Sequence, residues 1–122
     1  MLHHVSLEVA PDEVERTVEF FGLLGFARIP APDQIAPFVT WLESETTQIH
    51  LIHTPEPITP ALGHPAVVAG DFDAAIARLA DADFRVEEAD ELWGERRSFA
   101  VLPSGQRVEV MAAPPPPRTQ GA

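Results

Sequence analysis

The chain has 122 residues, no cysteine, and a formal net charge of −11 from 19 acidic and 8 basic residues. This length suits one compact domain or two small modules, and the lack of cysteine excludes disulfides and thiolate-bound zinc. The acidic charge repels a phosphate backbone and the apolar runs are too short to cross a bilayer, so we expect neither a nucleic-acid nor a membrane partner. The N-terminus lacks the basic and then apolar pattern of a secretion signal, and we expect a cytoplasmic protein.

The first half of the chain predicts a strand, a helix and three further strands. Residues 2–9, LHHVSLEV, alternate between polar and apolar side chains, which is typical of a half-buried strand. A helix is predicted over 11–26, with Asp12 and Glu15 as a capping box and Gly25 as its C-terminal stop. Extended segments follow at 26–30, 37–43 and 47–53. The predicted order is therefore βαβββ.

The second half repeats this order after a proline-rich linker at 54–62. A strand at 63–69 precedes a helix at 71–84, for which Asp71 is the predicted cap, and strands follow at 85–91, 96–103 and 105–112. We therefore expect modules at 1–53 and 63–113, and a proline-rich, disordered tail at 114–122.

Matching residues indicate that the two halves are an internal duplication. His64 follows His4 by 60 residues, and Glu109 follows His50 by 59 residues, with each pair at equivalent places in its half. The predicted fold class is α+β, with two βαβββ modules that form a cupped sheet.

Strand alternation decides which of these side chains face away from the helix-covered core. His4, His50 and Glu109 each alternate with apolar neighbours and must face away from them. The strand of His64 is apolar on both faces, and its equivalence to His4 assigns it to the same side. Three imidazoles and one carboxylate suit one divalent metal ion, namely Zn, Ni, Mn, Fe or Co. The sequence thus predicts the ligands His4, His50, His64 and Glu109, and assigns His3 and His53 structural or surface roles.

Four segments resemble the signature pieces of the vicinal oxygen chelate superfamily: HHVSLEV, FFGLLGF, GHPAVVAGDFDAA and LPSGQRVEVM. This superfamily includes glyoxalase I, methylmalonyl-CoA epimerase, fosfomycin resistance enzymes, extradiol dioxygenases and bleomycin-binding proteins. The resemblance covers about residues 2–112 and implies two βαβββ modules around one divalent metal. Its histidine positions match His4 and His64, and its final-strand glutamate matches Glu109. Glyoxalase I and the epimerase usually have Glu or Gln where this chain has His50.

The resemblance implies a metal-dependent lyase or isomerase that chelates neighbouring oxygens of a small-molecule substrate. His50 and Glu109 are its candidate catalytic residues, and His50 is a fourth ligand or a proton carrier. The candidates for the substrate wall are Phe38, Trp41, Trp93, Arg96 and Arg97. The resemblance also implies a homodimer, and it leaves open whether the metal site lies within one chain or is shared by two.

Two other functions remain open at this stage. One is a metal-free module that binds a small molecule or drug, as bleomycin-binding relatives do, and the acidic charge suits a cationic drug. The other is an iron-dependent extradiol-type dioxygenase, because His4, His64 and Glu109 form a set of two histidines and one carboxylate.

Overall fold

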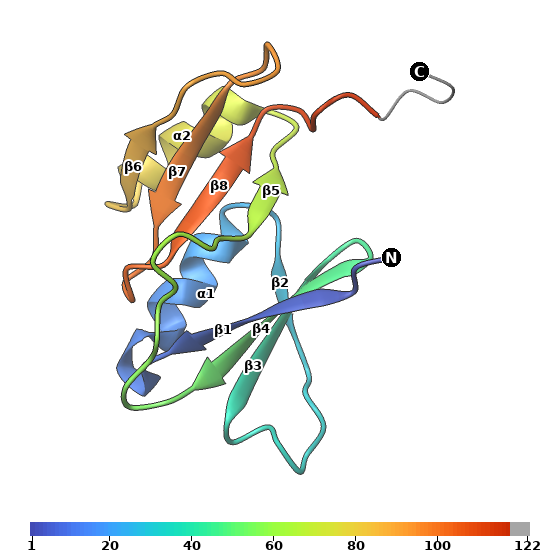
Figure 1. Cartoon of the computed structure of the whole chain (residues 1–122). Coiled ribbons are helices and arrows are strands. Elements are labelled where there is room, and N and C mark those ends of the chain that lie inside the picture. Colours follow the sequence, from blue (N-terminus) through green and yellow to red (C-terminus); the bar gives the residue numbers. More distant parts are fainter. Residues whose placement is uncertain (118–122) are drawn as a thin grey trace.

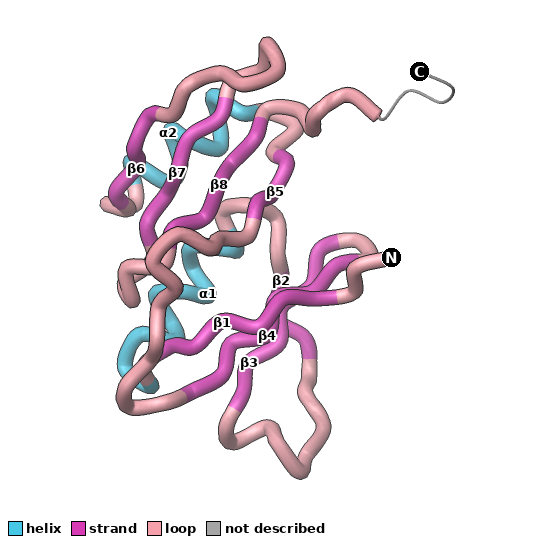
Figure 2. Tube along the Cα trace, viewed as in Figure 1, coloured by secondary structure: helices cyan, strands magenta, loops and turns pink. Residues whose placement is uncertain are grey.

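The computed structural model describes residues 1–117 (Figures 1 and 2). The first half contains β1 (His4–Val9), η1 (Pro11–Glu13), α1 (Val14–Gly22), β2 (Ala27–Ile29), β3 (Val39–Ser44) and β4 (Thr47–His53). The second half contains β5 (Ala66–Val68), α2 (Phe72–Asp81), β6 (Arg85–Glu88), β7 (Arg97–Val101) and β8 (Arg107–Met111). In this described part, no helix is long and apolar enough to cross a membrane.

Each half forms its own four-stranded sheet with the same topology. The strand order is β1-β4-β3-β2 in the first, here called sheet A, and β5-β8-β7-β6 in the second, sheet B. In both sheets the first strand pairs parallel to the last, and the other pairings are antiparallel. The predicted fold class, α+β with two βαβββ modules, is confirmed. The boundaries predicted for the modules and the linker stay a prediction.

Both helices end in the same way, which supports the duplication. The Phe26 amide donates to the Phe21 carbonyl and the Gly25 amide to the Gly22 carbonyl, which together form a Schellman motif. The Phe84 and Asp83 amides make the equivalent bonds after α2. The residue at the left-handed position has φ of +94° in the first motif and +66° in the second. The predicted stop at Gly25 follows from this backbone requirement.

The predicted cap of the first helix is wrong, whereas that of the second is confirmed. Pro11 begins a 3-10 turn in which the Glu13 amide donates to the Ala10 carbonyl, and no side chain caps this turn or α1. Because this turn displaces the start of α1, Asp12 does not occupy the cap position. At α2, the Ala74 amide donates to Asp71 Oδ1 at 3.2 Å, as expected for a capping aspartate.

Some strands are shorter than predicted. The strand predicted at 63–69 is reduced to β5, because Pro65 lacks an amide hydrogen and the segment before it follows the linker. His64 therefore lies two residues before β5 rather than within it. The strand predicted at 85–91 ends at Glu88 in β6. The predicted disordered tail at 114–122 falls partly on residues 118–122, which lie outside the described residues.

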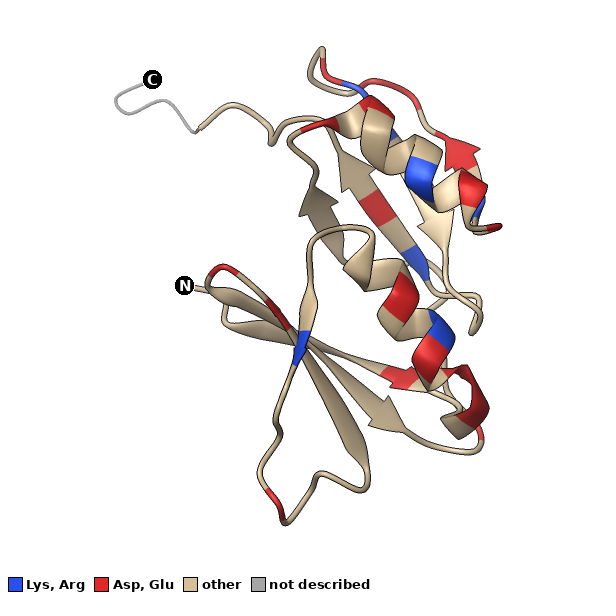
Figure 3. Cartoon of the chain, turned by 180° about the vertical axis from the view of Figure 1, so that it is seen from behind, with Lys and Arg blue, Asp and Glu red and all other residues tan. Residues whose placement is uncertain are grey.

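The two modules share one hydrophobic core, and α1 and the segment that follows α2 contribute to the contact between them. Phe20 of α1 packs edge-to-face on Phe84, with ring centroids 5.1 Å apart. The Arg16 guanidinium lies 3.7 Å from the centre of the Phe84 ring and donates a hydrogen bond to the Ala82 carbonyl. Seen from behind, both helices lie on the same side of the molecule, and acidic residues follow their outer surfaces (Figure 3). The opposite face of each sheet carries no helix (Figure 1).

Two glycines three residues apart test the Schellman motif of α1. We expect Gly25→Ala to lower the free energy of unfolding by about 1–2 kcal/mol, because Cβ disfavours the left-handed backbone. Gly22→Ala, within the last turn of α1, adds a methyl group with no atom within 4 Å and should raise stability by up to about 1 kcal/mol. Urea denaturation measures both changes, and equal effects would contradict the assignment.

Candidate metal centre

Sheet A displays a row of polar and aromatic side chains on the face that its helix leaves open. Ser6 of β1 pairs with His50 of β4, and His50 pairs with Trp41 of β3, so all three residues share a face. His4 lies two residues before Ser6 and belongs to the same face. Leu51, the neighbour of His50, is fully buried on the helix side. The strand register therefore places His4 and His50 on the face away from the helix, as predicted.

Three rings on this face form a stack with His50 in the middle. The His50 and Trp41 rings are 4.2 Å apart and nearly parallel, at 6°. His4 stacks on His50 with ring centroids 3.9 Å apart and an angle of 17°. Its Nδ1 is 2.9 Å from Nδ1 of His3, so one of these two rings donates to the other. Both faces of the His50 ring are covered, and only 8% of this residue is exposed.

This environment favours the neutral form of His50. Burial lowers the pKa of His50 below the ordinary value of 6.5, and positive charge on His4 and His3 lowers it further. The Nε2 atom of His50 lies 2.7 Å from Oε1 of Gln48. A neutral imidazole has one nitrogen with a lone pair, which can bind a metal ion or accept a proton.

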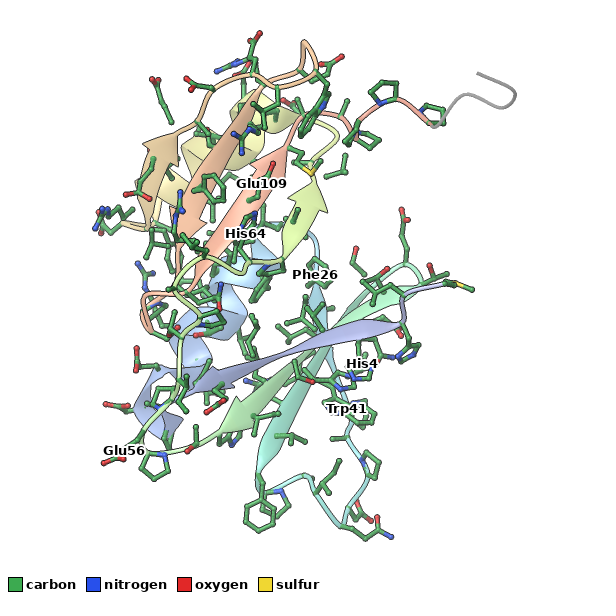
Figure 4. All side chains as sticks on the ribbon, viewed as in Figure 1. His4, Phe26, Trp41, Glu56, His64 and Glu109 are labelled. Carbon is green, nitrogen blue, oxygen red and sulfur yellow. The ribbon has the colours of Figure 1, made fainter. Side chains whose placement is uncertain are left out.

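Sheet B carries the other two predicted ligands in direct contact (Figure 4). Nε2 of His64 is 3.1 Å from Oε1 of Glu109, and Arg97 Nη1 is 3.5 Å from Oε2 of the same carboxylate. Phe99, which pairs with Glu109 across β7 and β8, packs edge-to-face on His64 with ring centroids 4.9 Å apart. Glu109 is only 8% exposed, and these two neighbours supply its polar contacts.

The second contact of His64 fixes a hydrogen on its Nδ1 atom. Nδ1 of His64 is 2.9 Å from the Leu62 carbonyl oxygen, which can only accept, so Nδ1 carries the hydrogen. In the neutral ring Nε2 then has a lone pair directed at a carboxylate oxygen. The pair is satisfied only by a second proton on His64 or by a cation bound to both atoms. The same two atoms are the predicted metal ligands of sheet B, and their roles as ligands stay a prediction.

The register confirms that these residues occupy equivalent places in the two modules. Ser6 pairs with His50, and Ala66 pairs with Glu109. Ser6 lies two residues after His4, and Ala66 lies two residues after His64. His50 and Glu109 are also both among the few buried polar residues of the described chain.

Within one chain, the four predicted ligands form two separate pairs. Across residues 1–117 no group of three or more His, Cys, Asp or Glu side chains could hold a metal ion. His64 lines a cavity of about 200 Å³ together with Val5 and Leu7, on the face of β1 opposite to His4. Figure 4 likewise shows His4 on sheet A and the His64–Glu109 pair on sheet B. We call His4, His50 and Trp41 half-site A. We call His64, Glu109 and Arg97 half-site B.

The five predicted substrate residues are not gathered at one place. Trp41 belongs to half-site A and Arg97 to half-site B. Arg96 instead pairs with Asp73 and lies 4.9 Å from the Phe72 ring, at the start of α2. The indole N–H of Trp93 donates to the Ala113 carbonyl at 3.1 Å. Phe38 is 63% exposed in the loop before β3. Their roles toward a substrate stay a prediction.

The sequence analysis assigned no role to several residues around the two half-sites. Gln48 contacts His50, and strand alternation could have found it, because residues two apart share a face. Gln106 donates to the Gly63 carbonyl next to His64, a contact between distant segments that has no local signal. His53 contacts Thr40 Oγ1 at 2.8 Å on the helix side of sheet A.

Comparisons with known proteins agree on the family. The model of the Glyoxalase/Bleomycin resistance protein/Dioxygenase superfamily matches residues 1–110. The chain belongs to this superfamily. Among curated proteins, none matches it.

Solved structures with low sequence identity share the fold. A glyoxalase family protein from Bacillus anthracis superposes with a TM-score of 0.80 at 20% identity, over 91% of this chain and 93% of the other. The oxidase ChaP-H2 gives 0.73 at 20% identity, over 94% of each chain. A glyoxalase/dioxygenase from Nostoc punctiforme gives 0.69 at 17% identity, over 93% of this chain and 91% of the other.

The pKa of His50 makes stability depend on pH in the metal-free protein. Because this pKa is lower in the folded chain, the unfolded chain binds more protons as the pH falls below 6.5. The contribution of His50 to stability is therefore lost as the pH falls from 6.5 through the folded-state value. We expect His50→Gln to reduce the loss of stability between about pH 7.5 and pH 5.5, as measured by urea denaturation. An unchanged pH dependence in the variant would contradict this.

Proposed function

We propose that this chain is a glyoxalase-like metalloenzyme, a lyase or isomerase, whose metal site forms where half-site A of one copy meets half-site B of another. The observation that carries the proposal is the close contact of His64 Nε2 with Glu109 Oε1 at 3.1 Å, while Nδ1 of the same ring faces the Leu62 carbonyl. Imidazole nitrogens and a carboxylate oxygen fit a divalent ion such as Zn, Ni, Mn, Fe or Co.

A second copy is needed because one chain does not bring the half-sites together. The packing of α1 on Phe84 holds sheet A so that His4 and His64 lie on opposite sides of β1. Each chain keeps two donors in each half-site, and an isologous dimer would therefore pair A with B twice. The homodimer expected from the resemblance follows from the same reasoning.

The chain's own residues have distinct roles in this proposal. His4, His50, His64 and Glu109 would hold the metal, with His50 either as fourth ligand or as the group that carries the substrate proton. Trp41 would form an apolar wall beside His50, and the Arg97 guanidinium would orient negatively charged substrate oxygens next to Glu109. A bound divalent metal supplies Lewis acidity toward two neighbouring oxygens of a small substrate. Because its pKa is lowered, His50 is neutral at neutral pH and has a lone pair that could bind the metal or accept a proton.

Two alternatives remain within the superfamily. A metal-free drug-binding module is consistent with the net charge of −11, which suits a cationic ligand. An iron-dependent dioxygenase is consistent with the pair His64–Glu109 and one further histidine, and an oxidase and a glyoxalase/dioxygenase share the fold. Uptake of oxygen with a catechol would select the second alternative.

Complementation between two inactive variants tests the shared site. One chain carries His4→Ala and His50→Phe, where Phe keeps the stack on Trp41, and the other carries His64→Ala and Glu109→Gln. Each variant alone should bind no metal. Mixed dimers, isolated with two tags that contain no histidine, should bind about half the wild-type amount of Zn²⁺, because one of the two sites is intact. Metal content is measured by elemental analysis after equilibration.

The control variant is His53→Ala, which removes an imidazole from the helix side of sheet A and touches no predicted ligand, and it should bind Zn²⁺ like the wild type. Mixed dimers without metal, from variants that fold and dimerise, would contradict a shared site. A wild-type protein that takes up none of the candidate ions would contradict the metalloenzyme itself and favour the drug-binding module.

A further inference from the structure

Three side chains on the open face of sheet A form a hydrogen-bonded chain that ends at His50. Nε2 of Gln48 donates to Oε2 of Glu43 at 2.9 Å, across the β3–β4 pair. Oε1 of the same amide is 2.7 Å from Nε2 of His50. Glu43 is thus connected to His50 only through Gln48. Neither Glu43 nor Gln48 belongs to half-site A as defined above.

The chemistry of these groups fixes the hydrogen of the imidazole. An ionised carboxylate only accepts hydrogen bonds, so Glu43 selects the orientation in which Gln48 presents its NH₂ group to it. The amide oxygen of Gln48 then faces His50 and also only accepts. Nε2 of His50 must therefore be the donor, and in the neutral ring Nδ1 is left with the lone pair.

The contacts of His50 leave only one of its two ring nitrogens without a hydrogen-bond partner among residues 1–117. Trp41 covers one face of its ring and His4 covers the other. With Nε2 bonded to Gln48, only Nδ1 remains, and we find no hydrogen bond to it from any of residues 1–117. The lone pair of His50 is thus confined to one atom at the edge of the stack.

We propose that Glu43 and Gln48 are positioning residues that hold His50 in the Nε2–H tautomer and so present its Nδ1 lone pair on the open face. What Nδ1 then binds rests on the proposed metalloenzyme function, but the tautomer does not. Half-site B uses a different device for the same purpose. There the Leu62 carbonyl holds the hydrogen on Nδ1 of His64, so that Nε2 carries the lone pair toward Glu109. The two modules therefore present opposite nitrogens of their imidazoles.

The tautomer can be read directly by two-bond ¹H–¹⁵N correlation NMR of the full, metal-free chain. Spectra are recorded near pH 8, where the neutral form dominates. The His50 signals are assigned by their loss in His50→Phe. In the wild type, we expect His50 to be almost entirely the Nε2–H tautomer. A wild-type His50 that carries its hydrogen on Nδ1 would overturn the proposal.

The informative variant is Glu43→Gln, which is isosteric and does not touch His50. An amide at position 43 can accept or donate, so Gln48 can turn over, and we expect His50 to become a mixture of tautomers. Glu8→Gln is the matched control, because it removes the same charge from β1 on the same face of sheet A, and it should leave the tautomer unchanged. Gln48→Leu removes the acceptor and should have the larger effect. Should Gln48→Leu fail to fold, Glu43→Gln still decides the question.

Zn²⁺ titration of the same variants gives the functional reading. We expect Glu43→Gln to weaken Zn²⁺ binding by about 10-fold or more, as for other changes in residues that orient a ligand, whereas Glu8→Gln should not. A His50 tautomer that stays unchanged in Glu43→Gln, or equal Zn²⁺ affinities of Glu43→Gln and Glu8→Gln, would overturn the positioning role. If no variant and no wild type binds Zn²⁺ while the tautomer moves as expected, the proposed metal site fails and the tautomer assignment stands.

Discussion

The packing of Phe20 on Phe84 is the contact on which the arrangement of the two modules depends. It joins α1 of the first module to the segment that follows α2 in the second, and Arg16 covers the same Phe84 ring. Edge-to-face aromatic pairs contribute about 0.5–1.5 kcal/mol beyond the burial of their area. His64 lies beside Val5 and Leu7, on the face of β1 opposite to His4, so the predicted ligands of sheets A and B are not brought together within residues 1–117. The two half-sites are a consequence of this packing.

The two modules carry different polar side chains at equivalent places on their open faces. Each sheet buries alternate apolar residues against its helix, and the polar residue between them is held on the open face. In sheet A that residue is His50, whose neutral form is favoured by burial between two rings. In sheet B it is Glu109, whose negative charge is balanced by Arg97 and directed at His64. One module therefore contributes two imidazoles, and the other contributes an imidazole and a carboxylate.

The local patterns of the sequence predicted much of the fold and the faces of the donors. Period-two alternation placed His4, His50 and Glu109 on the open faces, and Asp71 and Gly25 marked helix ends, because all of these depend on near neighbours in the chain. The capping role of Asp12 was wrong because Pro11 starts a 3-10 turn, so that α1 begins only at Val14. Local patterns were therefore sufficient for the strand faces and for these two helix ends. They were not sufficient for the start of α1.

The separation of the ligands into two pairs could not be predicted from the sequence, since it depends on how distant segments pack. Nothing near His64 in the chain shows that it lies beside Val5 and Leu7 rather than beside His4. Likewise, the tautomer of His64 is set by a backbone carbonyl, which every residue possesses and which no motif reveals. The resemblance to a known family left open whether the site is formed by one chain or two. The separation of the two pairs within residues 1–117 is the reason for the proposed shared site.

The central claim is that the metal is held by half-site A of one copy and half-site B of another. A crystal structure of the Zn²⁺-loaded protein, with anomalous diffraction at the zinc edge, tests it most directly. The account predicts an anomalous peak bounded by His4 and His50 of one chain and by His64 and Glu109 of its partner. A peak bounded by ligands of one chain alone, or no peak at these four residues in protein shown to contain zinc, would contradict it.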